Sequence, residues 1–158
     1  MKSAIVAIAL LGLAGAAQAQ QKDAPAPLTF EQALQVDQGL HALDGYKRII
    51  KDGQREYEAT ELYKLGPGLR VQIGLAIARL DPVAREFQTQ NNDLIRKYAD
   101  GGTSVAAKNT QDYLAAFQAL QKTSSGVVIP HIVVKELDLE HNPIQGTVLG
   151  LLNPILDQ

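Results

Sequence analysis

Residues 69–98 read LRVQIGLAIARLDPVAREFQTQNNDLIRKY and carry the clearest helical pattern in the chain. Their apolar residues recur mostly at intervals of four and three, which places them on one narrow stripe of a helix. The stripe consists of Leu69, Ile73, Ala76, Leu80, Val83, Phe87, Leu94 and Tyr98. This spacing predicts a helix about 45 Å long that packs along a partner helix. Pro82 should bend the helix, or split it with Asp81 as the cap of the second part.

The predicted partner helix follows a polar connection, residues 103–109, and Asn109 or Thr110 can cap it. Its apolar positions are Tyr113, Leu114, Phe117 and Leu120. A short connection between two amphipathic helices predicts an antiparallel helical hairpin. Residues 123–126, TSSG, end this second helix.

Residues 28–45 predict a shorter helix before the long one. Thr29 and Gln32 match a capping box, so the helix should begin near Phe30. Its apolar positions are Phe30, Ala33, Leu34, Val36, Leu40 and Leu43. Asp44-Gly45 should end it, because glycine commonly follows the last turn of a helix.

Residues 46–59 predict a β-hairpin, because Asp52-Gly53 is a favoured pair for a two-residue turn. Such a turn gives the register Lys47–Glu58, Arg48–Tyr57 and Ile49–Glu56. The good helix formers in EYEATELYKL leave a helix over residues 46–62 as the alternative. Gly53 would weaken that helix, so we expect the hairpin.

Residues 127–134, VVIPHIVV, predict a strand, and Pro130 places it at a sheet edge or a bulge. We expect this strand to join the hairpin, since an isolated two-stranded ribbon is marginal in water. Asn142 and Pro143 predict the cap and first residue of a last helix. The apolar face of that helix is Ile144, Val148, Leu151, Leu152 and Ile155.

These elements predict an α+β domain that is mainly α. We expect a long kinked helix in an antiparallel helical pair, a small β-hairpin or three-stranded sheet, and short terminal helices. The expected organisation is a signal peptide over residues 1–19, a flexible segment over residues 20–27, and one domain over residues 28–158.

The first 19 residues have the order of a secretory signal peptide. Lys2 gives a positive start, residues 4–13 are apolar, and Ala17-Gln18-Ala19 is a small-x-small cleavage site. The apolar run is shorter than the roughly 20 residues that a spanning helix needs. We therefore expect a cleaved, periplasmic or secreted protein that does not span the membrane, with an uncleaved anchor or a buried helix as the alternatives.

The composition of the 158 residues excludes several function classes. Lys and Arg number 15 and Asp and Glu 17, so there is no broad basic surface for nucleic acid. The chain has no cysteine, which excludes disulfides, thiolate zinc sites and a cysteine nucleophile. It contains no G-x-S-x-G serine motif, and Gly66-x-Gly68 lacks the rest of a phosphate-binding fingerprint.

Three segments resemble a family of small uncharacterised phage and prophage proteins. They are residues 43–53 (LDGYKRIIKDG), 63–88 (YKLGPGLRVQIGLAIARLDPVAREFQ) and 137–157 (LDLEHNPIQGTVLGLLNPILD). In that family a central helix precedes a polar loop, a shorter helix, a Val/Ile-rich strand and a short helix that starts with proline. The resemblance supports the fold and brings no catalytic motif. It implies, as one alternative function, a phage-related accessory of the envelope in lysis or superinfection.

Two groups of side chains are weak candidates for a metal site. Asp37, His41 and Asp44 share one face of the first helix, and Asp138, Glu140 and His141 cluster before the last helix. A metal-assisted hydrolase or a carbohydrate-acting protein is the corresponding alternative function. A solvated helix face and helix capping explain both groups more simply, and we expect no cofactor.

The function we expect from sequence is an exported, non-enzymatic module that binds an unknown protein partner. The candidate interaction surface is the stripe of the long helix, namely Leu69, Ile73, Leu80, Phe87, Leu94 and Tyr98. Packing within the molecule is the alternative role of this stripe, and it favours a monomer over a homodimer.

Overall fold

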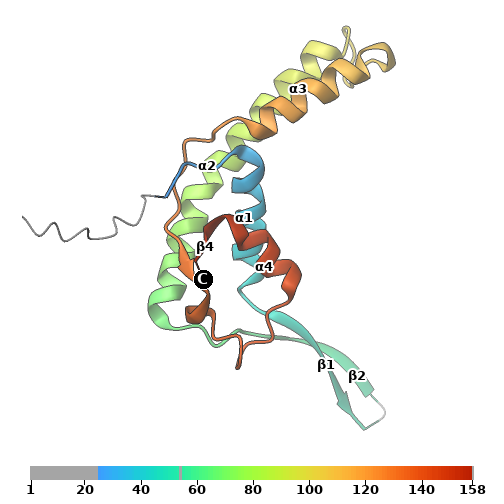
Figure 1. Cartoon of the computed structure of the whole chain (residues 1–158). Coiled ribbons are helices and arrows are strands. Elements are labelled where there is room, and N and C mark those ends of the chain that lie inside the picture. Colours follow the sequence, from blue (N-terminus) through green and yellow to red (C-terminus); the bar gives the residue numbers. More distant parts are fainter. Residues whose placement is uncertain (1–24, 54, 158) are drawn as a thin grey trace, which may run out of the picture.

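The long helix is present in the computed structural model, which describes residues 25–53 and 55–157 (Figure 1). Helix α2 (Pro67–Tyr98) runs unbroken through Pro82 and changes direction along its length (Figure 1). The predicted bend is therefore confirmed, and the alternative of two separate helices is wrong. Pro82 lies on the exposed side, where water can solvate the carbonyl group that the missing N–H leaves free.

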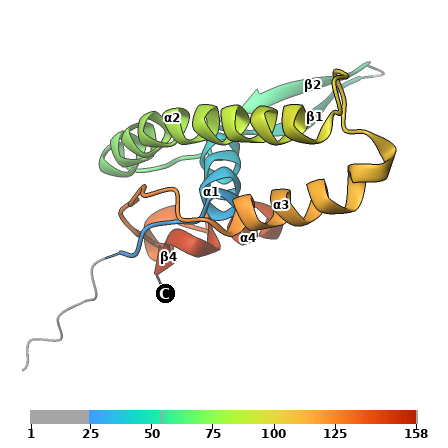
Figure 2. The same ribbon diagram turned by 90° about the horizontal axis from the view of Figure 1, so that it is seen from above.

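Helix α3 (Thr110–Lys122) lies antiparallel along the second half of α2, which confirms the predicted helical hairpin (Figures 1 and 2). Four ring contacts connect the core to the far end of this pair, with centroid distances of 5.6 to 6.3 Å. They join Phe30 to Phe87, Phe87 to Phe117, Phe117 to Tyr113, and Tyr113 to Tyr98. Asn109 precedes α3 without capping it, because its side chain donates to the Tyr98 carbonyl instead.

Helix α1 (Phe30–Ala42) is at the centre of the fold, between α2 on one side and α3 and α4 on the other (Figure 2). It begins with the predicted capping box between Thr29 and Gln32. Gly39 faces α4, and a Cβ at this position would lie 2.9 Å from Cδ2 and Cγ of Leu152. The close approach of the two helices therefore requires glycine.

Strands β1 (Tyr46–Asp52) and β2 (Arg55–Glu61) form the predicted antiparallel hairpin, which projects from the helices (Figure 1). The helical alternative for residues 46–62 is wrong. The predicted register is also wrong, because the closing pair is Asp52–Arg55 and Ile49 lies opposite Glu58. This register differs from the predicted one by two residues, so each side chain stays on the expected face of the hairpin.

The predicted strand over residues 127–134 forms only in part. Strand β3 (Ile132–Val133) pairs in parallel with β4 (Leu156–Asp157), and the hairpin forms a separate sheet. The predicted third strand of the hairpin is therefore wrong. Burial alternates only over residues 128–130, where Ile129 is buried between two exposed neighbours, and His131 is exposed where a strand's alternation would bury it.

Helix α4 (Gly146–Leu152) begins after the predicted start at Pro143, because Asn142 is not its cap. Asn142 is buried and bonds to distant main chain instead. The most deeply buried C-terminal side chains are Ile132, Leu137, Leu152 and Ile155, which belong to the core together with α1 and α2. Among the helices of the described ranges, none is both long and apolar enough to cross a membrane. The predicted signal peptide and residues 20–24 lie outside those ranges.

Gly39→Ala should lower the free energy of unfolding by about 1 to 2 kcal/mol, measured by urea denaturation. Crowding against Leu152 costs about 1 to 3 kcal/mol, and the better helix propensity of alanine offsets part of it. Gly74→Ala in α2 is the matched control, since no atom lies within 4 Å of its added Cβ. This second variant should be as stable as the parent chain or more stable. Equal effects at both positions would contradict the packing argument.

Candidate functional site

The first predicted metal cluster, Asp37, His41 and Asp44, contains one side-chain contact, between Asp37 and His41 of α1. Nε2 of His41 lies 3.7 Å from Oδ1 of Asp37. Burial raises the pKa of Asp37, and nearby Asp81 adds to this, whereas His41 lowers it. Asp44 is exposed beyond the helix end. Across residues 25–53 and 55–157, no group of three or more His, Cys, Asp or Glu side chains could hold a metal ion. This finding corrects the prediction of a metal site at Asp37, His41 and Asp44.

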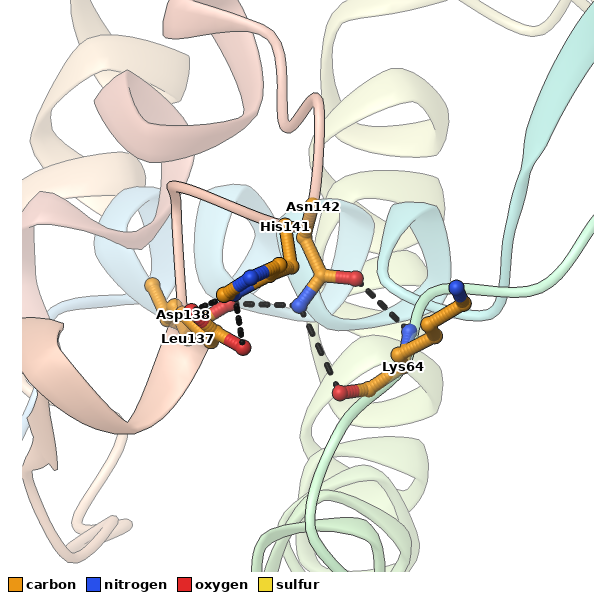
Figure 3. Close-up of polar contacts among 5 residues, drawn as sticks. All are labelled: Lys64, Leu137, Asp138, His141 and Asn142. Atoms are coloured by element: carbon orange, nitrogen blue, oxygen red, sulfur yellow. Dashed lines mark hydrogen bonds and ion pairs between the residues drawn. The ribbon is translucent and has the colours of Figure 1, made fainter.

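The second predicted cluster is a pair of side chains in a loop (Figure 3). Nδ1 of His141 lies 2.9 and 3.0 Å from the two carboxylate oxygens of Asp138. Asp138 has a left-handed backbone, with φ 48°. Glu140 is exposed and does not join them. The pair shapes the turn before Asn142 and does not provide a third ligand.

Asn142 is the centre of the network in Figure 3. Its side chain is 2% exposed; its Oδ1 accepts from the Lys64 N–H at 2.7 Å, and its Nδ2 donates to the Leu137 carbonyl at 2.8 Å. Arg70 holds the same connection between β2 and α2, donating to the Tyr63 carbonyl at 2.6 Å. These bonds tie the C-terminal loop to the start of α2.

The predicted interaction stripe of α2 faces the interior. Leu69, Ile73 and Leu80 are buried in the core, while Phe87 and Leu94 pack against it and are partly buried. Tyr98 is half-buried beside Tyr113 of α3. The stripe therefore serves packing within the molecule, which corrects its assignment as an interaction surface.

The neighbouring flank of α2 does carry exposed apolar side chains. Val71 is 63% exposed and Leu75, one turn later, is 59% exposed. They line an open groove of about 200 Å³ whose other walls include Ala76, Arg79 and Pro130. The apolar stripe of α2 did not predict this surface, although the four-residue spacing of positions 71, 75 and 79 places them on one face of a helix.

Residues 127–131 run beside α2, and Pro130 is the residue of this segment that lines the groove. Gln72 donates from Nε2 to the His131 carbonyl at 3.1 Å, and His131 Nδ1 lies 2.7 Å from Oδ1 of Asp157. Ile129 points into the core, whereas Val128 is 38% exposed. Within the described part of the chain, the main-chain N–H and C=O groups of Val128 and Ile129 form no hydrogen bond.

The projecting hairpin is the other exposed surface, and its charges are largely paired. Lys47 binds Glu58 at 3.1 Å, and Lys51 binds Glu56 at 2.8 Å. A further hydrogen bond joins Tyr46 to Glu61, which raises the pKa of the tyrosine and lowers that of the carboxyl. Arg79 at the groove differs, because it has no hydrogen bond or ion pair to any described residue.

The chain matches no protein-family model, no curated protein and no solved structure. The resemblance to phage and prophage proteins therefore stays a prediction.

Asn142→Ala should lower the free energy of unfolding by about 2 to 4 kcal/mol, because it leaves the Lys64 N–H and the Leu137 carbonyl without a partner. Urea denaturation measures the change. Asn92→Ala, on the exposed surface of α2, is the control and should stay within about 0.5 kcal/mol of the parent. If both variants unfold at the same denaturant concentration, Asn142 is not the anchor described above.

Asp37→Asn should raise the thermal midpoint at pH 7, because burial raises the pKa of this carboxyl and so disfavours its charged form. Because the folded-state pKa of Asp37 lies above the unfolded value, the protonated carboxyl contributes to the stability of the parent chain. This contribution is complete below the unfolded pKa and is lost as pH rises through the folded pKa. The difference in thermal midpoint between variant and parent should therefore vanish at pH values below 3.8, the ordinary pKa of an aspartate. Asp93→Asn, at an exposed ion pair with Arg96, should change the midpoint little. A difference that is independent of pH would reject this explanation.

Proposed function

We propose that this chain is an exported protein-binding module that catalyses no reaction and binds its partner at the groove beside α2. The observation that carries the proposal is the exposure of Val71 and Leu75 on one face of a helix whose core stripe is already covered. Burying each side chain fully in an interface would contribute about 1.5 to 3 kcal/mol. The signal-peptide pattern in residues 1–19 supports export.

The form of the groove favours a protein over a small molecule. Its volume of about 200 Å³ is below the roughly 300 to 1,000 Å³ of typical ligand pockets, and it is open to solvent along its length. Its lining includes Val71, Leu75 and Pro130, apolar groups that the side chains of a partner protein can cover in an interface.

The lining of the groove offers binding chemistry. Among the described residues that line the groove, Arg79 is the one charged side chain, and there is no histidine, serine or carboxylate. General acid–base catalysis needs a group that exchanges a proton near neutral pH, which arginine does not. The lining is therefore suited to recognition.

Replacement of Leu75 by the photo-crosslinker p-benzoylphenylalanine should give a discrete adduct with a partner protein on irradiation of cells that make the full chain. The same replacement of Leu114 is the control, because this exposed residue of α3 lies outside the groove. Mass spectrometry identifies the adduct. Equal labelling from both positions, or none from Leu75, would contradict a binding site at the groove.

Export is tested separately by fractionation. The chain should be recovered outside the cytoplasm with Gln20 as its first residue, as the intact mass from mass spectrometry would show. Recovery of the intact chain in the cytoplasm would contradict export. Binding at the groove would then still be tested by the crosslinking experiment.

A further inference from the structure

The β-hairpin projects from the helices with little support from the rest of the fold (Figure 1). Every residue of β1 and β2 is exposed or half-buried, and among the residues of these strands Tyr46, at the base, packs against the core. A two-stranded ribbon is at best marginally stable in water, whereas a third strand or a packed helix stabilises it. Within the described chain the hairpin therefore lacks a packing partner, which a second protein can provide.

Both outer edges of the hairpin are free. Among the described residues, β1 and β2 pair only with each other, so no further strand covers either edge. In an antiparallel pair, alternate residues of each strand point their N–H and C=O groups away from the other strand. These groups face outward along each edge, where the main chain of an added strand can bond to them.

The apolar side chains favour the edge of β1 over that of β2. Ile49 of β1 is 66% exposed, and the residue opposite it in β2 is Glu58, so the isoleucine has no apolar partner across the hairpin. Tyr57, the exposed apolar residue of β2, already lies opposite Ile50. Pairs of apolar side chains on neighbouring strands stabilise a sheet. A strand added to β1 would provide the pair that Ile49 lacks.

Charge defines the residues on either side of that pair. Lys47 and Lys51 share one face of β1 with Ile49, because alternate residues of a strand point to the same side. Each lysine binds one glutamate of β2, at 3.1 and 2.8 Å, and an ammonium group has three N–H donors. The two lysine side chains are 71% and 73% exposed. Each can therefore bind a second carboxylate from a strand on the other side of β1.

A second copy of this chain fits this edge less well. Two β1 strands paired in antiparallel fashion about Ile49 would place Lys47 of one copy opposite Lys51 of the other, and like charges directly opposite one another are destabilising. Pairing with β2 of another copy in the register of the hairpin would again place Glu58 opposite Ile49. The edge therefore favours a strand of a different protein.

We propose that the outer edge of β1 binds a strand of a partner protein with the pattern acidic-x-apolar-x-acidic. The apolar residue lies opposite Ile49, and the two carboxylates lie opposite Lys47 and Lys51. The pattern reads the same in both chain directions, so parallel and antiparallel addition both satisfy it. This interface shares no residue with the groove beside α2, and it goes beyond the proposed function by adding a second binding surface.

A phage-displayed library of random decapeptides, panned against the full chain, tests the pattern. The parent chain should enrich an apolar residue with an acidic residue two positions away on each side. Four substitutions exchange the charges of two hairpin ion pairs, namely Lys47→Glu, Lys51→Glu, Glu56→Lys and Glu58→Lys. This variant keeps both attractions within the hairpin and should enrich lysine or arginine at the two flanking positions.

Two further variants keep the selection interpretable. Arg96→Asp with Asp93→Arg exchanges an exposed ion pair of α2 and is the matched control, so its selected sequences should equal those of the parent. Ile49→Thr keeps a β-branched side chain and should no longer enrich an apolar residue at the central position. Circular dichroism confirms that each variant is folded.

A synthetic copy of the most enriched decapeptide locates the bound strand by hydrogen exchange. Its addition should slow the exchange of the β1 amides and leave residues 68–79, beside the groove, unchanged. N-methylation of the alternate peptide amides that face β1 should weaken binding by about tenfold, equivalent to about 1.4 kcal/mol. Methylation of the other alternate set should leave binding unchanged, and equal effects of the two sets would overturn strand addition.

Four other results would overturn the proposal. They are no enrichment by the parent chain, enrichment of basic residues in place of acidic ones, the same enrichment by the charge-exchanged variant, and protection of residues 68–79 in place of β1. Crosslinking of a partner from Leu75 together with any of the first three would leave the proposed function standing and reject only the strand site. Strand addition at β1 without crosslinking from Leu75 would reject the groove and keep the hairpin.

Discussion

The burial of α1 between α2 and the C-terminal elements is the constraint on which the structure depends. Helix α1 covers the apolar stripe of the first half of α2, and its approach to α4 requires Gly39. A helix covers only one side of its neighbour, so the adjacent flank of α2 stays uncovered. Val71 and Leu75 lie on that flank, and the candidate site is thus a consequence of how the core is closed.

Long-range hydrogen bonds hold the surroundings of the groove in place. Asn142 and Arg70 hold the connection that leads into α2, and Gln72 donates to the carbonyl of His131, the residue after Pro130 of the groove. A site that is ordered before binding loses less conformational entropy when a ligand arrives. The bond from Gln72 also holds residues 127–131, most of which lack regular secondary structure, beside α2.

The two clusters of acidic and histidine side chains show that residue spacing predicts contacts between pairs of side chains but does not predict a metal site. Spacing of four on a helix correctly placed Asp37 beside His41, and spacing of three placed Asp138 beside His141. A metal site needs a third ligand at the same point, and that ligand must come from the right direction. In both groups the third residue is exposed, and it forms no three-ligand group with the other two in the described ranges.

Local patterns were sufficient for the helices, the capping box at Thr29, the bend at Pro82 and the existence of the hairpin, since each depends on residues within one or two turns of one another. Tertiary packing alone decided the role of Asn142, which bonds to main chain 78 residues away, and the pairing of β3 with β4. It also produced the groove, because two segments distant in sequence form its walls. Such contacts depend on how elements pack in space, and periodicity along the chain does not encode that arrangement.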